Sequence, residues 1–199
     1  MITIIDYKSG NLKSVQNALD RLNIPYKTAS RPADVIKAEK IIFPGVGAAG
    51  EAMKNLRSLN LISPIKKFIS SNSPFLGICL GAQILFEKSA ENNTRCLGVL
   101  KGKNVIFPKS KVIVPHMGWN QVKYSKNNKL FSGIANSSYF YFVHSYYLSP
   151  VNNIAIAKTN YSQTFVSVYN YKNIYGVQFH PEKSADDGLM LLKNFNNIC

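Results

Sequence analysis

A cysteine between two glycines gives the sequence its clearest chemical feature. The segment Gly77-Ile78-Cys79-Leu80-Gly81 stands between an apolar run that predicts a strand and a run that predicts a helix. The flanking glycines permit a sharp turn without a Cβ clash, and the side chain at the centre of such a turn points outward. A helix beginning at Cys79 also directs backbone N–H groups toward the sulfur, which favours a thiolate. We predict a nucleophile, against the alternative of a buried cysteine beside two packing glycines.

Acyl transfer by a cysteine also needs a group that takes and returns a proton, and histidine suits both steps near neutral pH. His180 follows an apolar, strand-like run, and Glu182 comes two residues later. Positions i and i+2 of extended backbone face the same way, so Glu182 can orient His180 while Pro181 stiffens the pair. Alone, a His-Pro-Glu segment is more often a surface turn. Together with the Cys79 turn, it predicts a relay of sulfur, imidazole and carboxylate.

The remaining cysteines and histidines carry no comparable motif. Cys96 and Cys199 stand at wide spacings, with no CxxC pair and no Cys/His cluster of zinc spacing, so we expect neither disulfides nor a metal site. His116 and His144 are interpreted as architectural or interface residues. No cofactor is expected.

Two kinds of hydrophobic pattern follow one another along the rest of the sequence. Apolar, β-branched runs at residues 2–5, 40–43, 74–78 and 174–179 predict strands. Helical spacing appears at residues 12–22 and 50–59, in a further segment through Ile65 and Phe68-Ile69, and at residues 189–195. A helix is also expected after Cys79, through Gln83, Leu85 and Phe86. Beyond about Gly98 the runs shorten, as at residues 112–114 and 154–157, which predicts antiparallel strands and hairpins. We therefore expect an α/β fold with a mostly parallel sheet flanked by helices, and additional antiparallel strands in the C-terminal half.

Length and charge bound the class of protein. The 199 residues, 46% of them hydrophobic, are enough for one compact domain over residues 1–199. Neither a run of about 20 apolar residues nor a secretory signal is visible, so we expect a cytoplasmic protein with no membrane contact. The formal charge of +14 comes from dispersed lysines rather than a basic arm. A solvated surface is the main interpretation, and a basic patch for a partner or phosphorylated substrate is the alternative.

Two extended segments resemble the class I, or triad, glutamine amidotransferases. They are residues 77–83, which read GICLGAQ, and residues 177–182, which read VQFHPE. Further segments are similar to the glutaminase subunits of imidazole glycerol phosphate synthases, namely residues 6–12, Pro44-Gly45-Val46-Gly47, PHMGWN at 115–120, FVHSY at 142–146 and Lys183-Ser184. The resemblance runs from Ile4 to about Ser184. Departures are Lys8-Ser9, Ala49 and Ala82, none of which touches the three predicted catalytic residues.

The resemblance implies a flavodoxin-like fold, a glutaminase activity and a role for each matching residue. Cys79, His180 and Glu182 would be catalytic, and Val46, Gly47 and Leu80 would form the oxyanion hole. Gly47, Gln83, Ser145 and Tyr146 would hold the amino-acid end of glutamine. The implied partner is a (βα)₈-barrel cyclase that receives ammonia in a heterodimer, with Trp119, Asn120 and Lys183 at the contact and the ammonia passage. Weak activity is expected until the partner and its ligand bind.

Several alternatives remain open at this point. The expected products are imidazole glycerol phosphate and AICAR in histidine biosynthesis, but similar glutaminases supply ammonia to related synthases that act on bacterial surface sugars. A cysteine peptidase or γ-glutamyl hydrolase would use the same three residues. A nucleic-acid-binding protein would use the positive charge, although no basic run or aromatic stacking motif supports it.

Overall fold

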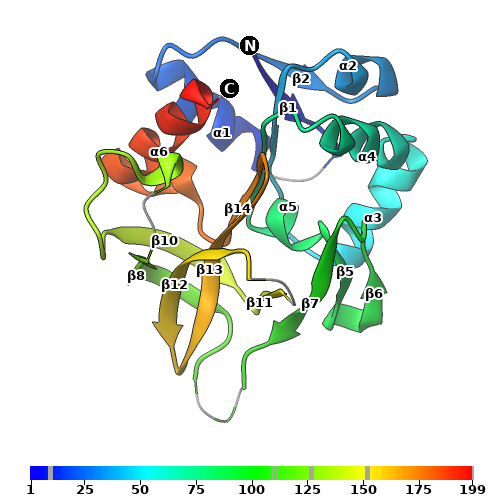
Figure 1. The fold of residues 1–199 in the computed structure, drawn as a ribbon. Helices are drawn as coiled ribbons and strands as arrows, with labels where there is room; N and C mark the ends of the chain where they lie inside the picture. Colours follow the sequence, from blue (N-terminus) through cyan, green and yellow to red (C-terminus); the bar gives the residue numbers. More distant parts are fainter. Residues whose placement is uncertain (9–10, 109, 111, 126–127, 151–152, 199) are drawn as a thin grey trace.

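The computed structural model (Figure 1) describes residues 1–8, 11–108, 110, 112–125, 128–150 and 153–198. In it, parallel strands form one half of the main sheet. In their order across the sheet, these strands are β2 (Tyr26–Ala29), β1 (Ile2–Ile5), β3 (Lys40–Phe43), β4 (Phe75–Ile78) and β14 (Ile174–Val177). All residues of β1, β4 and β14 are buried. This confirms the expectation that the apolar runs form a parallel sheet covered on both faces.

Helices cover both faces of these strands. They are α1 (Leu12–Arg21), α2 (Pro32–Ile36), α3 (Ala49–Ser58), α4 (Ile62–Ser70), α5 (Leu80–Gln83) and α6 (Ala185–Asn197). The buried residues of α1 and α6 share one hydrophobic cluster, and those of α2, α3 and α4 share the other. Figure 1 shows α1 and α6 on one side of the strands and α3 and α4 on the other.

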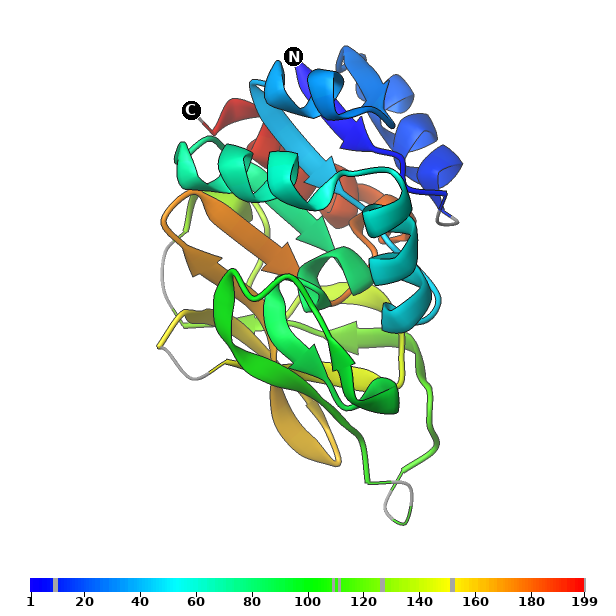
Figure 2. The ribbon, with the colours of Figure 1, turned by 90° about the vertical axis from the view of Figure 1, so that its right-hand side faces the viewer.

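Antiparallel strands make up most of the C-terminal half, as predicted. The sheet continues from β14 through β13 (Gln163–Tyr171), β11 (Tyr146–Pro150), β7 (Leu100–Ile106), β5 (Phe86–Ser89) and β6 (Thr94–Arg95). Off this order, β12 (Ala155–Tyr161) pairs with β13, and β9 (Lys123–Tyr124) pairs with β12. A separate two-stranded ribbon pairs β8 (His116–Gln121) with β10 (Tyr139–His144). The described residues also form short 3-10 helices at η1 (Glu91–Asn93), η2 (Lys129–Phe131) and η3 (Pro181–Lys183). Figure 2 shows this β-rich half below the helical layers.

Two local predictions are wrong. The helix after Cys79 ends at Gln83, and Phe86 already begins β5. Side chains from distant strands bind the last carbonyl oxygens of this helix: the Tyr169 hydroxyl donates to Ala82 O at 2.9 Å, and Asn104 Nδ2 donates to Gln83 O at 2.9 Å. Residues 112–114 form no strand; the Ile113 carbonyl instead accepts from the Tyr161 hydroxyl at 2.8 Å. Tertiary contacts override local propensity at both places.

The carboxyl ends of the parallel strands meet at one edge of the sheet. The loops after β1, β3, β4 and β14 all begin there, and ligand sites of open α/β sheets lie at this edge. None of the helices within the described residues is long and apolar enough to cross a membrane. The fold thus brings four loops, far apart in the sequence, to one place.

Candidate active site

Cys79 occupies a strained turn between β4 and α5. Its backbone has φ +51° and ψ −109°, a conformation that costs a residue with a side chain about 1–3 kcal/mol. The turn is therefore made by the cysteine itself, whereas the sequence pattern assigned the bend to its glycine neighbours. The glycines serve close packing instead: a Cβ on Gly77 would lie 2.7 Å from Ala82 Cα, and one on Gly81 would overlap the Phe43 carbonyl oxygen.

His180 and Glu182 lie beside this turn as a fully buried pair. His180 Nδ1 and Glu182 Oε1 are 2.7 Å apart, and neither side chain has any exposed surface. Asn11, from the loop after β1, donates a hydrogen bond to the same carboxylate oxygen and stands 3.4 Å from His180 Nδ1. Because the carboxylate is the acceptor, the proton on Nδ1 points toward Glu182 and leaves Nε2 for the sulfur side.

The electrostatics of His180 depend on Cys79. Burial lowers the pKa of His180, but the charge of Cys79, its hydrogen bonding and the Glu182 carboxylate together raise it to about 10. His180 Nε2 is buried and makes no well-formed hydrogen bond to any described residue. The sulfur and the imidazole are therefore neighbours, and the imidazolium form of His180 is favoured, although Nε2 and the sulfur make no well-formed hydrogen bond.

The backbone of His180 is fixed by the β8–β10 ribbon. Its N–H donates to the Tyr141 carbonyl at 2.9 Å, and its carbonyl accepts from the Ser184 hydroxyl at 2.6 Å. The same hydroxyl oxygen accepts from the Tyr141 N–H at 2.9 Å. Strand β10 also reaches the nucleophile, because the Val143 carbonyl lies 3.9 Å from Cys79 Sγ.

A cavity of about 290 Å³ opens over the cysteine. Its lining consists of Val46, Gly47, Cys79, Leu80, Gln83, Glu91, Pro115, Val143, His144, Ser145 and Tyr146. Every residue predicted for the oxyanion hole or for substrate binding lies on this wall. His180 and Glu182 do not line it; they lie buried beside the cysteine.

Gln83 meets the cavity with one end of its amide. Gln83 Nε2 donates to the Tyr146 carbonyl at 2.8 Å and to Gln178 Oε1 at 3.0 Å, so both of its N–H groups are used inside the protein. Gln178 Nε2 in turn lies 3.7 Å from Cys79 Sγ. The side-chain oxygen Oε1 of Gln83 is therefore the atom left to meet a ligand.

The predicted oxyanion donor is already occupied. The Leu80 N–H donates to the Gly45 carbonyl at 3.3 Å, across the loop after β3. Gly47, two residues further, has φ +92°, a conformation that glycine adopts without strain. An anion above Cys79 thus meets the Leu80 N–H only after the Gly45 carbonyl turns away.

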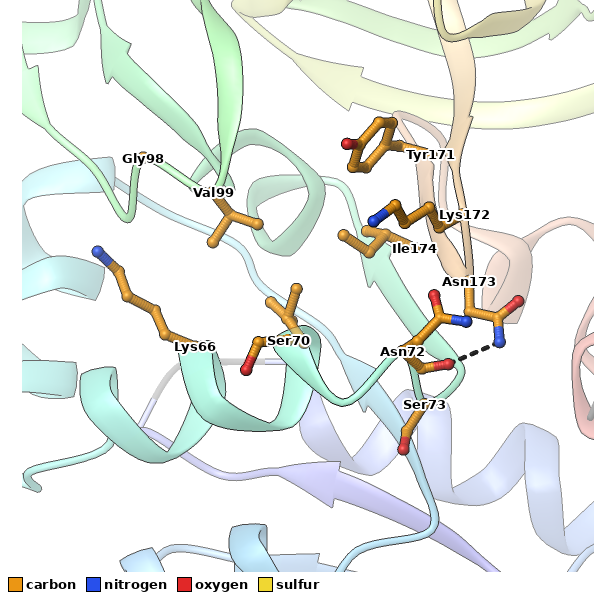
Figure 3. Close-up of a pocket in the computed structure, with 11 residues that line it drawn as sticks. Lys66, Ser70, Asn72, Ser73, Gly98, Val99, Tyr171, Lys172, Asn173 and Ile174 are labelled. Atoms are coloured by element: carbon orange, nitrogen blue, oxygen red, sulfur yellow. Dashed lines mark hydrogen bonds between the residues drawn. The ribbon is translucent and has the colours of Figure 1, made fainter.

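A second cavity of about 320 Å³ lies at the opposite edge of the sheet, between the end of α4, Val99 and the β13–β14 turn (Figure 3). Its walls carry Lys66 and Lys172 over an apolar floor with Ile69 and Ile174, and no cysteine, histidine or carboxylate lines it. It is the larger of the two but holds no nucleophile with a base. The chemistry therefore belongs to the cavity over Cys79.

The residues predicted for the partner contact, Trp119, Asn120 and Lys183, do not all lie on one surface. Trp119 is 52% exposed on the outer face of β8, and Lys183 is exposed on η3. Asn120 points inward, where its Nδ2 lies 3.2 Å from His116 Nε2 and donates to the Asn160 carbonyl at 3.0 Å. The structure therefore does not bring Asn120 to the same surface as Trp119.

Cys96 lies away from this site and packs in the interior. Burial raises the pKa of its thiol to about 11, which is consistent with a packing residue. Cys199 lies outside the described residues, as do Ser9 and Gly10 of the loop after β1. Within the described part of the chain, no three His, Cys, Asp or Glu side chains are grouped so as to hold a metal ion.

Comparison with known proteins identifies the family of this chain. Residues 3–198 match the family described as glutamine amidotransferase class-I. The chain belongs to this family. It is 48% identical over 195 residues to the imidazole glycerol phosphate synthase subunit HisH of Methanocaldococcus jannaschii, covering 98% of both chains. It is also 45% identical over 206 residues to the HisH subunit of Maridesulfovibrio salexigens, covering 100% of this chain and 97% of that one.

Solved structures support the fold of this class-I glutamine amidotransferase. A crystal structure described as a glutamine amidotransferase superposes with a TM-score of 0.77 at 17% identity, covering 98% of this chain and 100% of that one. A glutamine amidotransferase from Thermotoga maritima gives a TM-score of 0.63 at 16% identity, covering 98% and 82%. The predicted α/β class and family are thus both confirmed.

Three side chains of this amidotransferase site were not assigned roles from the sequence. Gln178 is a fully buried polar residue that follows an apolar strand, and that contrast is a signal that the pattern contained. Asn11 lay in a segment that resembles the family, residues 6–12, but no role was predicted for it. Glu91 gave no signal at all, because it lies in a short 3-10 helix; there its Oε2 accepts from the Ala49 N–H at 2.7 Å.

Proposed function

We propose that this chain is the glutaminase component of an imidazole glycerol phosphate synthase. It hydrolyses glutamine to glutamate and passes ammonia to a cyclase subunit that forms imidazole glycerol phosphate and AICAR in histidine biosynthesis. Residues 1–199 act as one amidotransferase domain, in the cytoplasm. The observation that carries the proposal is the strained Cys79 turn beside the buried His180 and Glu182 pair, opening into a cavity at the carboxyl edge of the sheet.

The chemistry follows from this arrangement. The Cys79 thiolate attacks the side-chain carbonyl carbon of glutamine, and the His180 imidazolium gives its proton to the leaving nitrogen, so ammonia departs and a glutamyl thioester remains. Water then attacks the thioester while the now neutral His180 accepts its proton. Collapse of that intermediate releases glutamate and restores the thiolate and imidazolium pair. Glu182 orients the ring throughout and stabilises its positive charge.

The amino-acid end of glutamine meets the far wall of the cavity. Its ammonium group needs acceptors, and the side chains of Gln83 and Glu91 both line this space with an oxygen to offer, Gln83 Oε1 and the Glu91 carboxylate. Its carboxylate needs donors, which the backbone at Ser145 and Tyr146, together with Gly47, supplies. The side-chain amide then lies toward Cys79 at the other end of the cavity.

The oxyanion hole needs a rearrangement of the loop after β3. Turning the Gly45–Val46 peptide would free the Leu80 N–H and direct the Val46 N–H inward, giving the tetrahedral oxyanion two donors. Gly47 lowers the cost of such a turn. Loss of one oxyanion donor typically costs about 100-fold to 1,000-fold in kcat. The unpartnered chain is therefore a weak glutaminase.

The outer face of the β8–β10 ribbon is the docking surface for the (βα)₈-barrel cyclase. Met117, Trp119 and Tyr139 are 62%, 52% and 55% exposed there, and their positions in the strand register place them on one face. Large side chains gathered on one exposed face are typical of an interface. Lys183 lies on η3, next to this ribbon, and Asn120 supports it from within.

The decisive experiment measures glutamate release from glutamine by the purified chain, alone and with its cyclase and the cyclase ligand. Cys79→Ala is the control. We expect Cys79-dependent release that rises by about 100-fold or more with the partner, because both oxyanion donors then become available. Cleavage of peptides or γ-glutamyl peptides in preference to free glutamine would instead support a hydrolase. Co-purification and activation by a sugar-modifying synthase would support the other ammonia acceptor.

A further inference from the structure

Two buried histidines take no part in the proposed reaction. His116 on β8 and His144 on β10 are cross-strand partners on the inner face of the ribbon, 3% and 6% exposed. His116 Nδ1 and His144 Nε2 are 3.0 Å apart. His144 lines the cavity over Cys79, whereas His116 stacks on the Tyr161 ring with centroids 4.0 Å apart. Burying such polar groups is costly unless their hydrogen bonds are satisfied.

The hydrogen bonds of this pair have a determined direction. The Tyr146 carbonyl, 2.8 Å from His144 Nδ1, can only accept, so His144 carries its proton on Nδ1 and accepts at Nε2. His116 must therefore donate from Nδ1, and its Nε2 accepts from the Asn120 amide at 3.2 Å. Each of the four ring nitrogens has one partner, and both rings are neutral in this arrangement.

The hydrogen-bond chain ends on an atom that also binds Gln83. The Tyr146 carbonyl accepts from His144 on one side and from Gln83 Nε2, at 2.8 Å, on the other, which uses both of its lone pairs. This carbonyl is therefore closed to a ligand. Its two donors instead fix the orientation of the peptide groups that form the far wall of the cavity.

We propose that His116 and His144 are positioning residues for the amino-acid end of glutamine. They hold the Tyr146 peptide in its binding orientation before the substrate enters, and they tie it to the ribbon whose outer face carries Trp119. This inference rests on the proposed function, because it takes the cavity as the glutamine site. Neither ring acts as the general base, since both nitrogens of each are already engaged.

Two substitutions at His116 separate positioning from packing. His116→Phe keeps a flat ring between Phe142 and Tyr161 but removes the donor to His144, whereas His116→Asn restores an N–H near the place of Nδ1. Losing this one hydrogen bond should raise the KM for glutamine about threefold to tenfold in His116→Phe, with a smaller change in kcat. His116→Asn should return the KM to within about twofold of the parent.

A spectroscopic measurement tests the same hydrogen-bond chain without turnover. Nitrogen-15 chemical shifts of the imidazole rings should show both His116 and His144 as neutral tautomers protonated on Nδ1 at neutral pH. An Nε2-protonated tautomer of His144, or an unchanged KM in His116→Phe with an active parent, would overturn the proposal. An inactive parent whose Cys79→Ala variant also fails to bind glutamine would instead overturn the proposed function itself.

Discussion

Acid should lower the free energy of unfolding of this protein through the buried pair His116 and His144. Replacing one of the two rings by a group that does not titrate should halve this loss. The perturbation is His116→Asn, which keeps a donor for His144 but cannot take up a proton. In the parent, burial lowers the pKa of His116 to about 4, and burial, with a smaller contribution from neighbouring histidines, lowers that of His144 to about 3. Both rings therefore stay neutral when the protein is folded at about pH 5.

The sign and size follow from proton linkage. Unfolded histidine titrates near pH 6.5, so below that pH the unfolded chain binds two protons that these rings do not bind when folded, and the free energy of unfolding falls. Well above pH 6.5 this contribution vanishes. At about pH 5, the difference of about 1.5 pH units times about 1.36 kcal/mol gives about 2 kcal/mol per ring and about 4 kcal/mol for both. Only a folded pKa below about 5 is needed for this result.

Urea unfolding at about pH 7.5, 6.5 and 5 measures the effect directly. Over this range the parent should lose about 2 kcal/mol more than His116→Asn, whatever their stabilities at the highest pH. His180 works in the opposite direction, because its pKa, raised to about 10, makes the folded protein bind a proton before the unfolded chain does. That contribution grows as the pH falls toward 6.5 and is the same in both proteins, so it cancels in the comparison. Equal losses in the two proteins would show that His116 is protonated when folded, and would refute the linkage.

Three further predictions concern the site itself. Gly81→Ala should prevent stable folding, because its Cβ would overlap the Phe43 carbonyl oxygen. Thermal melting should show this loss, with Gly50→Ala, whose Cβ would meet only Thr94 Oγ1 at 3.6 Å, as the control. Cys79→Ala should lower the pKa of His180 from about 10, since the neighbouring charge is lost and burial remains; an NMR titration showing no fall would contradict this. Glu182→Gln should reduce kcat on the order of a thousandfold with little change in KM, as stopped-time glutamate assays would reveal.

The parallel half of the fold was predictable because its strands are buried on both faces. Continuous apolar runs and intervening helical spacing are then direct consequences of burial, and they appear in the sequence. The short α5 was not predictable, since its end depends on Tyr169 and Asn104, which belong to distant strands. The strand expected at residues 112–114 failed for the same reason. The local sequence pattern does not predict the structure where side chains from distant strands form hydrogen bonds with the backbone carbonyl groups.

The meeting of Cys79 with His180 and Glu182 was predictable from a topological rule. Each follows a parallel strand, and carboxyl ends of parallel strands share one edge. Their catalytic roles remain a proposal. Glu91 and the inward orientation of Asn120 were not predictable, because they depend on the antiparallel half, whose register the sequence leaves open.

Strand β10 connects the outer face of the ribbon to the proposed site. Its Tyr141 carbonyl holds the His180 N–H, its Val143 carbonyl faces the Cys79 sulfur, and its His144 holds the Tyr146 carbonyl. Tyr141 and Val143 have side chains on the same face as Trp119, in register with β8. Under the proposed function, a partner bound on that face would contact one strand whose backbone and side chains also reach His180, Cys79 and the Tyr146 carbonyl. A shift of this strand on partner binding would then alter the three contacts together, and this remains part of the proposal.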